Sequence, residues 1–237
     1  MFALRKTTLF LANLMLFASS AAHAQQRSIV NPSFEDVSSV PGLGNGFEIT
    51  PDTNVPGWQS TDGEIEIWVD GFQNKASQDG DYFIELNPRR PIGLYQEVCL
   101  VNGESLSWTW YHAARTGNPR RETTSYEVVS HDGQTIHQSL ATNTVIDTNN
   151  NATNDWDEVT GSAIYTGPTG IQRLQFRSLN RGSVGNFLDN VQIDLVPAID
   201  TLVESTSEVE GGTANLPTFI VSGLVQSPIT VTIFCLF

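Results

Sequence analysis

Four short runs between Ile65 and Arg115 constrain the fold of this 237-residue chain more than any other feature. They read IEIW, YFIEL, LYQEV and SLSWTWYH, and Gly, Asn, Asp or Pro occurs in each gap between them. Apolar and polar side chains alternate within the runs, which is the period of a β-strand. Because successive side chains of a strand point to opposite faces, the runs predict a sheet with one apolar and one polar face.

The expected polar face carries acids, amides, aromatic rings and an arginine. Its members are Glu66, Trp68, Glu85, Asn87, Gln96, Tyr111 and Arg115. Such a mixture suits sugars, because flat rings stack on C–H surfaces while amides, acids and arginine hydrogen-bond to hydroxyl groups. The face is therefore a candidate ligand site. The alternative is a structural ion pair between Arg115 and Glu85, with Trp68 half-buried under a loop, and the sequence leaves both open.

The remainder of the chain continues the pattern of short strands. Residues 125–130 and 134–139 flank the hairpin signal Asp132-Gly133, and residues 158–165, 172–179 and 187–196 have the character of further strands. Roughly nine to eleven strands with regular turn signals predict an all-β, antiparallel β-sandwich of the jelly-roll kind. Within it we expect Trp58 to close one end of the core and His112 to point inward.

The two ends of the chain differ from the strand-rich part between them. Residues 1–24 combine a basic start, an apolar stretch and the ending Ala-His-Ala, which predicts a cleaved signal peptide and a secreted or cell-surface protein. Residues 25–197 suit one domain. Residues 198–237 begin as an acidic linker and end in two strands that look like the opening of an Ig-like repeat. Two strands alone are marginal, so they pair elsewhere or the sequence is a piece of a longer protein.

Charge and cysteine content limit the possible partners. The formal net charge is -14, and removal of Arg5 and Lys6 with the signal makes the mature chain more acidic. This argues against nucleic acid and anionic lipid as partners. No later stretch is long and apolar enough for a membrane span. Export permits a disulfide between Cys99 and Cys235, but the position of Cys99 in an expected core strand favours a buried, unpaired thiol.

A series of motifs in fixed order resembles a known family. NPSFE, an isolated GW, IEIW, DGDYFIEL, YQEV, WTWYHAAR and FLDNVQI follow one another between Ser28 and Val196. In this respect the chain is similar to the carbohydrate-binding-module-like β-sandwiches of the galactose-binding-domain-like superfamily, which include the DUF642 proteins of plant cell walls. The resemblance implies a jelly roll of two antiparallel sheets with its first and last strands adjacent.

The same resemblance implies a structural calcium ion where the first and last strands meet. Carried over to this chain, the ligands in NPSFE and FLDNV are Glu35 and Asp189, with loop carbonyl groups completing the shell. The alternative is that Glu35 caps a turn and that Asp189 accepts hydrogen bonds from backbone amides.

Together these features predict an exported, non-catalytic module that binds a glycan or cell-surface polysaccharide, or that mediates adhesion. A purely structural domain of a surface or matrix protein is the alternative. A polysaccharide-active enzyme is disfavoured, because no G-x-S-x-G, H-E-x-x-H or P-loop motif occurs and the acids Glu64 and Glu66 have no clear geometry for catalysis.

Overall fold

The computed structural model describes residues 27–44, 46–115, 121–146, 155–196, 198–201 and 219–222. The expected signal peptide, Cys235 and the expected last strand at residues 229–237 lie outside this part of the chain. No helix among the described residues is long and apolar enough to cross a membrane.

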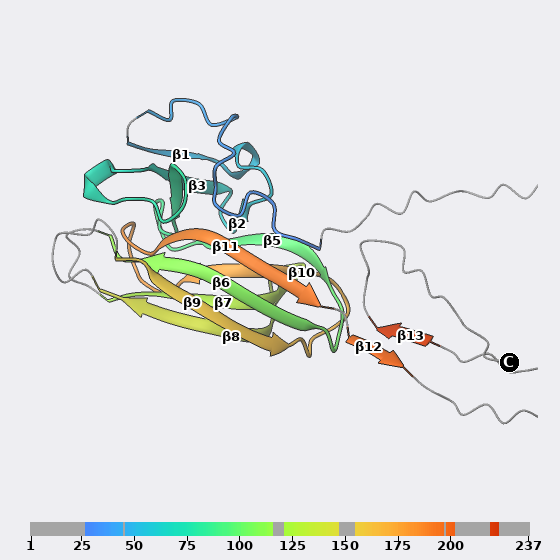
Figure 1. The fold of residues 1–237 in the computed structure, drawn as a ribbon. Helices are drawn as coiled ribbons and strands as arrows, with labels where there is room; N and C mark the ends of the chain where they lie inside the picture. The colour runs from blue at the N-terminus through green and yellow to red at the C-terminus, as the bar shows by residue number, and fades with distance from the viewer. Residues whose placement is uncertain are drawn as a thin grey trace, which may run out of the picture.

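Two antiparallel sheets make up the domain (Figure 1). The six-stranded sheet contains, in spatial order, β1 (Phe47–Pro51), β3 (Glu64–Val69), β4 (Tyr82–Glu85), β11 (Phe187–Val196), β6 (Ser105–Ala113) and β9 (Asp157–Ile164). The five-stranded sheet contains β2 (Gln59–Ser60), β5 (Gly93–Leu100), β10 (Gly170–Ser178), β7 (Glu122–Ser130) and β8 (Ile136–Val145). Two 3-10 turns, η1 (Asp52–Asn54) and η2 (Phe72–Asn74), lie in the connections. The predicted all-β antiparallel sandwich is confirmed.

The core lies between the inward faces of the two sheets. Trp110 from the six-stranded sheet meets Phe176 of the other sheet edge-on, and Tyr126 stacks on Phe176 with ring centroids 4.6 Å apart. Trp58 is buried in the same cluster, where its Nε1 donates to the carbonyl oxygen of Asn31. These rings are among the largest fully buried side chains, and their burial contributes to the driving force for folding. The predicted inward positions of Trp58 and of His112 on β6 are confirmed.

The run LYQEV is not in the same sheet as the other three, and this corrects the sequence analysis. IEIW, YFIEL and SLSWTWYH form β3, β4 and β6 of the six-stranded sheet, whereas LYQEV belongs to β5 between β2 and β10. Gln96 therefore does not lie on the expected polar face. It points into the core, where its amide accepts from the backbone N–H of Val30 and donates to the carbonyl oxygen of the same residue. Alternation fixes the face of a residue but not the sheet to which its strand belongs.

The chain ends and the outer surface add two observations. The N-terminal turn reaches the last strand of the sandwich through a hydrogen bond from the Val191 N–H to the Pro32 carbonyl, although β1 and β11 are separated by β3 and β4. Beyond the sandwich, β12 (Ala198–Thr201) pairs with β13 (Phe219–Ser222), so a strand forms where the sequence suggested a linker.

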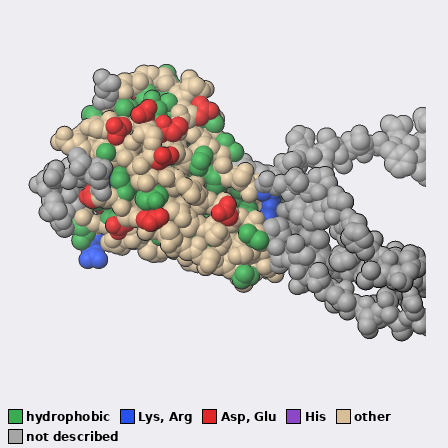
Figure 2. All heavy atoms as spheres, viewed as in Figure 1, with side chains coloured by type: hydrophobic (Ala, Val, Ile, Leu, Met, Phe, Trp, Pro, Cys, Tyr) green, Lys and Arg blue, Asp and Glu red, His purple; other side chains and the backbone are tan. Residues whose placement is uncertain are grey.

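Figure 2 shows Asp and Glu side chains spread over the part of the molecule near β1 and β3, with few Lys or Arg on this face.

Candidate functional site

The outer face of the five-stranded sheet carries a polar surface that the sequence analysis did not single out. Its side chains come from alternate positions of neighbouring strands, namely Tyr95 and Glu97 of β5, Arg173, Gln175 and Arg177 of β10, and Glu127 of β7. The strand register places Gln175 opposite both Tyr95 and Glu127, and Arg173 opposite Glu97. These residues therefore form cross-strand rows on one face of the sheet.

The arginines of this face are held by aromatic and acidic neighbours. The Arg173 guanidinium lies 4.2 Å from the centroid of the Tyr95 ring, and its Nε is 3.5 Å from Glu97 Oε1. Arg177 binds Glu127 through two hydrogen bonds, at 2.8 and 3.2 Å. A forked pair of this kind fixes the side chains in one orientation. Tyr95, Gln175 and Glu127 of this face are buried, whereas Glu97, Arg173 and Arg177 are partly exposed and their charges are largely neutralised within the face.

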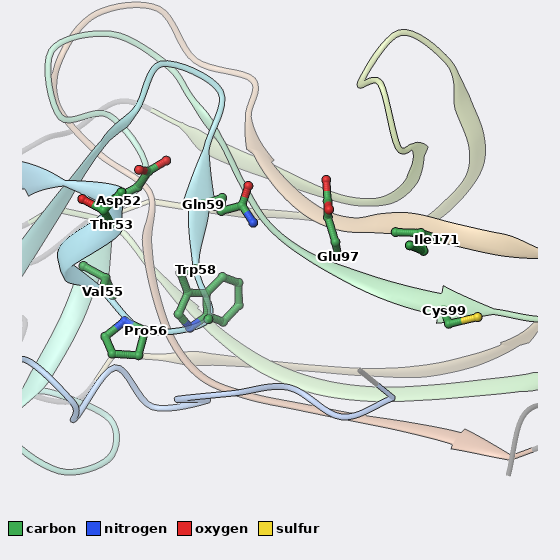
Figure 3. Close-up of a pocket in the computed structure, with 10 residues that line it drawn as sticks. Asp52, Thr53, Val55, Pro56, Trp58, Gln59, Glu97, Cys99 and Ile171 are labelled. Carbon is green, nitrogen blue, oxygen red and sulfur yellow. The ribbon is translucent and has the colours of Figure 1, made fainter. Parts of the chain in front are cut away.

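An open groove of about 570 Å³ adjoins this face at β2 (Figure 3). Its lining consists of Asp52, Thr53, Val55, Pro56, Gly57, Trp58, Gln59, Glu97, Cys99 and Ile171. Gln59 is held in place because its Oε1 accepts from the Tyr95 hydroxyl at 3.2 Å, and burial raises the pKa of that hydroxyl. Asp52 Oδ2 accepts from the Ser60 N–H at 3.1 Å. The groove therefore combines the carboxylates of Asp52 and Glu97, the amide of Gln59 and the hydroxyl of Thr53 with the apolar side chains of Val55 and Trp58.

The groove exists because β2 is short. It pairs only with Tyr95 and Leu94 of β5, so Glu97 further along β5 is partly exposed beside the turn at η1, although Cys99 is buried. Ile171, which faces Cys99 across the two strands, is 41% exposed. The sequence alone shows that Tyr95 and Glu97 share one face of their strand, and that Arg173 and Arg177 share one face of theirs. What the sequence lacks is the pairing that brings these strands and the η1 turn together.

The expected polar face on the six-stranded sheet exists, but most of it is sealed from solvent. Glu66 and Glu85 lie directly opposite each other on β3 and β4 and are buried, as is Trp68, whose Nε1 donates to Glu66 Oε1 at 3.0 Å. Trp68 packs in an outer apolar cluster with Phe83, Ala113 and Phe187. The alternation assigned the correct outward face to Glu66, Trp68 and Glu85. The covering loops and aromatic rings, which it did not predict, bury them.

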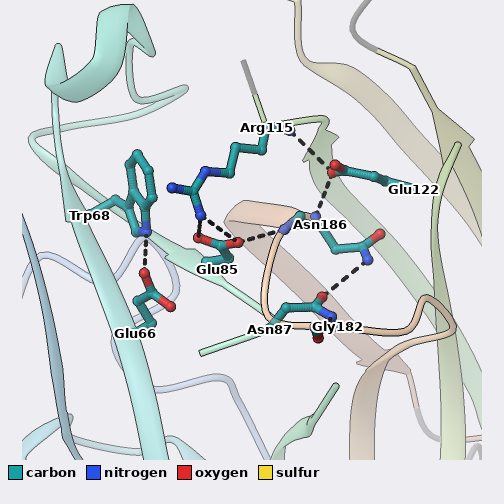
Figure 4. Close-up of polar contacts among 9 residues, drawn as sticks. Glu66, Trp68, Glu85, Asn87, Arg115, Glu122, Gly182 and Asn186 are labelled. Carbon is teal, nitrogen blue, oxygen red and sulfur yellow. Dashed lines mark hydrogen bonds and ion pairs between the residues drawn. The ribbon is translucent and has the colours of Figure 1, made fainter. Parts of the chain in front are cut away.

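Arg115 links these residues through a cation–π contact with Trp68 and hydrogen bonds to Glu85 (Figure 4). Its guanidinium lies 4.8 Å from the Trp68 ring centroid and 3.3 Å from Glu85 Oε2, and 21% of its side chain is exposed. Its backbone N–H donates to Glu122, which also accepts from the N–H of Asn186. The ion pair between Arg115 and Glu85 that the sequence left as an alternative is thus present. Glu122 and Asn186 were not anticipated.

The other two expected members of this face have separate roles. Asn87 is fully buried, donates to the Gly182 carbonyl and accepts from the Asn186 amide, so it belongs to the same network. Tyr111 is half-buried on β6 and donates its hydroxyl hydrogen to Glu158 at 3.1 Å. Only Arg115 and Tyr111 among the expected ligand contacts are partly accessible.

The facing acids Glu66 and Glu85 both have raised pKa values. Burial, followed by repulsion from Glu85, raises the pKa of Glu66 to about 8. Burial also raises the pKa of Glu85 to about 7, opposed by the Gly185 N–H and by Arg115. One guanidinium cannot compensate two facing buried carboxylates, so the pair retains a proton near neutral pH.

The two expected calcium ligands converge on one loop. Glu35 accepts from the backbone N–H groups of Asp81 and Tyr82, each at 3.0 Å. Asp189 accepts from Ser33 Oγ and from the N–H groups of Gln78, Asp79 and Asn190. A side chain at Gly80, which has a φ of +64°, would collide with the Glu35 carboxylate. Glycine at this position therefore lets the loop wrap around Glu35.

This arrangement does not fit a calcium ion without rearrangement. A carboxylate offers about four acceptor positions, and the four donors to Asp189 occupy them. The described residues contain no group of three or more His, Cys, Asp or Glu side chains placed to hold a metal ion. Burial raises the pKa of Asp189 to about 7, against the effect of its four donors. The calcium ion stays a prediction from the family resemblance.

Comparisons with known proteins found distantly similar solved structures but no family. No family model and no curated protein matches the chain. A cyclase from Fischerella sp. TAU is 18% identical, with a TM-score of 0.46 over 72% of this chain and 98% of the cyclase. The CBM22-1 xylan-binding domain of Paenibacillus barcinonensis Xyn10C is 16% identical, with a TM-score of 0.43 over 65% of this chain and 98% of that domain. TmCBM61, solved with β-1,4-galactotriose, is 17% identical, with a TM-score of 0.36 over 71% of this chain and 98% of TmCBM61.

Proposed function

We propose that this domain is an exported, non-catalytic carbohydrate-binding module that holds a neutral glycan on the outer face of the five-stranded sheet. The observation that carries the proposal is the groove beside β2, where Asp52, Gln59 and Glu97 line a hollow of about 570 Å³. Small-molecule sites commonly have volumes of roughly 300–1,000 Å³ and combine an apolar floor with a few fixed polar groups. The export and surface location rest on the character of residues 1–24.

The charge distribution favours a neutral ligand. Carboxylates accept hydrogen bonds from sugar hydroxyl groups, and the Gln59 amide is positioned by Tyr95 to donate one. A glycan rich in uronic acids would meet Asp52 and the acid-rich surface of Figure 2, while Arg173 and Arg177 already have glutamate partners. Repulsion between like charges would weaken its binding.

Titration calorimetry of the full chain with neutral and acidic oligosaccharides tests this proposal. We expect xylohexaose or cellohexaose to bind and oligogalacturonate not to bind. Gln59→Ala and Glu97→Gln should each weaken binding about tenfold, the effect of one lost hydrogen bond. Gln192→Ala, at an exposed glutamine of the other sheet, is the matched control and should bind normally. Absence of binding to every neutral glycan would refute the proposal.

The ligand contacts expected on the six-stranded sheet form a second, separately testable part of the proposal. Arg115 and Tyr111 are its partly accessible members. If a glycan contacts this face, Arg115→Lys should weaken binding, because lysine keeps the charge but loses the forked geometry. Unchanged affinity would mean that this face has the structural role that the sequence left as the alternative. The burial of Glu66 and Glu85 beside Arg115 favours that structural role.

A further inference from the structure

Lys75 and Asp155 form a close pair that joins two distant parts of the chain. Lys75 follows η2 in the connection between β3 and β4, and Asp155 precedes β9. The Lys75 side chain is fully buried, and its Nζ is 2.5 Å from Asp155 Oδ1. Two further contacts keep the segments in place. Trp156 Nε1 donates to the Ala76 carbonyl at 2.9 Å, and the Trp156 ring centroid lies 4.8 Å from Lys75 Nζ.

Aromatic rings lie on one side of this pair, whereas 43% of the Asp155 side chain is exposed to solvent. The Trp156 ring packs edge-on against Phe83, which belongs to the outer apolar cluster on the six-stranded sheet. Removing an ammonium group from water is costly, and an ion pair recovers that cost only in part. Conversion of the two ions into one neutral amide would remove the buried ammonium charge of Lys75.

We propose that Lys75 and Asp155 condense to an intramolecular amide bond. The Lys75 ammonium passes one proton to the Asp155 carboxylate, and the free amine attacks Cγ of Asp155. The Nζ–Cγ bond forms, one Cγ–O bond breaks, and that oxygen leaves as water with two protons that come from the original ammonium. An ammonium and a carboxylate thus give one amide and one water, with no change of oxidation state and no other reactant.

Two features of the structure favour this reaction. The fixed approach of Nζ to the carboxylate replaces an encounter in solution, and such proximity can supply a large effective concentration. The buried Lys75 side chain is shielded from solvent, whereas 43% of the Asp155 side chain is exposed, so the released water has a path out. The bond would also fasten the start of β9, an edge strand, to the loop before β4. This inference is independent of the glycan site on the opposite sheet.

Intact-mass spectrometry of the full chain tests the proposal directly. We expect the wild-type protein to be lighter than its sequence mass by one water molecule, while Lys75→Arg and Asp155→Ala have their full sequence masses. Asp155→Asn should lose ammonia instead of water, because the leaving group is then an amide nitrogen. Proteolysis should release a branched peptide that links Lys75 to Asp155. Loss of the cross-link should lower the melting temperature by roughly 10 °C, by analogy with other cross-links of long loops.

A matched control separates this reaction from unspecific dehydration. Arg89→Lys places a lysine beside Glu64 on the exposed surface, where Arg89 now forms an ion pair, and this pair should not condense. A wild-type mass equal to the sequence mass overturns the proposal. So does a water loss that persists in Lys75→Arg, since it would show dehydration at another site, such as cyclisation of an aspartate with its own backbone. The wild-type mass decides the question even if a variant fails to fold.

Discussion

At the scale of single residues, the facing pair of Glu66 and Glu85 is the most unusual feature of the domain. Both side chains are buried, they lie opposite each other on neighbouring strands, and Arg115 pairs with Glu85. Glu122 adds further negative charge near Glu85. Such a cluster is stable only while it retains a proton, so its contribution to folding depends on pH.

Raising the pH should therefore destabilise the domain. The pKa of Glu66 rises from 4.5 to about 8 and that of Glu85 to about 7, so folding takes up protons that the unfolded chain has lost. This stabilisation is complete below about pH 4.5 and disappears as the pH passes the raised values. Between about pH 6.5 and pH 8 we expect a loss on the order of 1–2 kcal/mol, measured as a falling melting temperature in calorimetry.

Variants can assign this pH dependence to the acid pair. Glu66→Gln mimics the protonated acid, so it should reduce the slope and raise the melting temperature at the alkaline end. The part of the slope due to Asp189, whose pKa is also raised to about 7, should remain. Glu64→Gln, two residues earlier on the same strand and partly exposed, is the control and should keep the wild-type slope. His112 has its pKa lowered to about 4, so its folded form stays neutral throughout this range. An unchanged slope in Glu66→Gln would show that another group is responsible.

At the scale of elements, the sequence predicted the faces of strands better than their neighbours. Alternation placed His112 of β6 on the inward side of its strand, and the structure confirms that it is buried. It could not show that the chain crosses from β4 to the opposite sheet before β5, because the two sheets share one core and impose the same period. For the same reason Gln96 was assigned to the wrong surface.

The candidate sites depend on such long-range pairing. The groove needs the η1 turn, β5 and β10, which come together only when β2 pairs with β5 and β5 pairs with β10. Burial of Trp68 depends on Phe47 of β1 and Phe72 of η2, whose rings pack against it. Local sequence patterns carry no information on either arrangement, whereas the outward direction of Trp68 follows from period two alone.

At the scale of the whole molecule, Glu35 and Asp189 fasten the N-terminal turn and β11 to the loop between β3 and β4. Because backbone and hydroxyl donors fill the acceptor positions of Asp189, we expect this junction to hold without a metal ion. The melting temperature should then be the same in excess calcium and in chelator. Asp189→Asn should still lower it by roughly 5–10 °C, because an amide N–H₂ would face backbone donors in a buried position.

The same measurement tests the calcium ion implied by the family resemblance. A bound ion stabilises the folded state by about 2.7 kcal/mol at a hundredfold excess over its dissociation constant, so chelation would then lower the melting temperature by several degrees. Loss of that dependence in Asp189→Asn, but not in Asp194→Asn at an exposed site on the same strand, would place the ion between Glu35 and Asp189. In that case the amide donors of the loop must turn away from Asp189 to admit the metal, and the hydrogen-bonded junction would be the metal-free state of the domain.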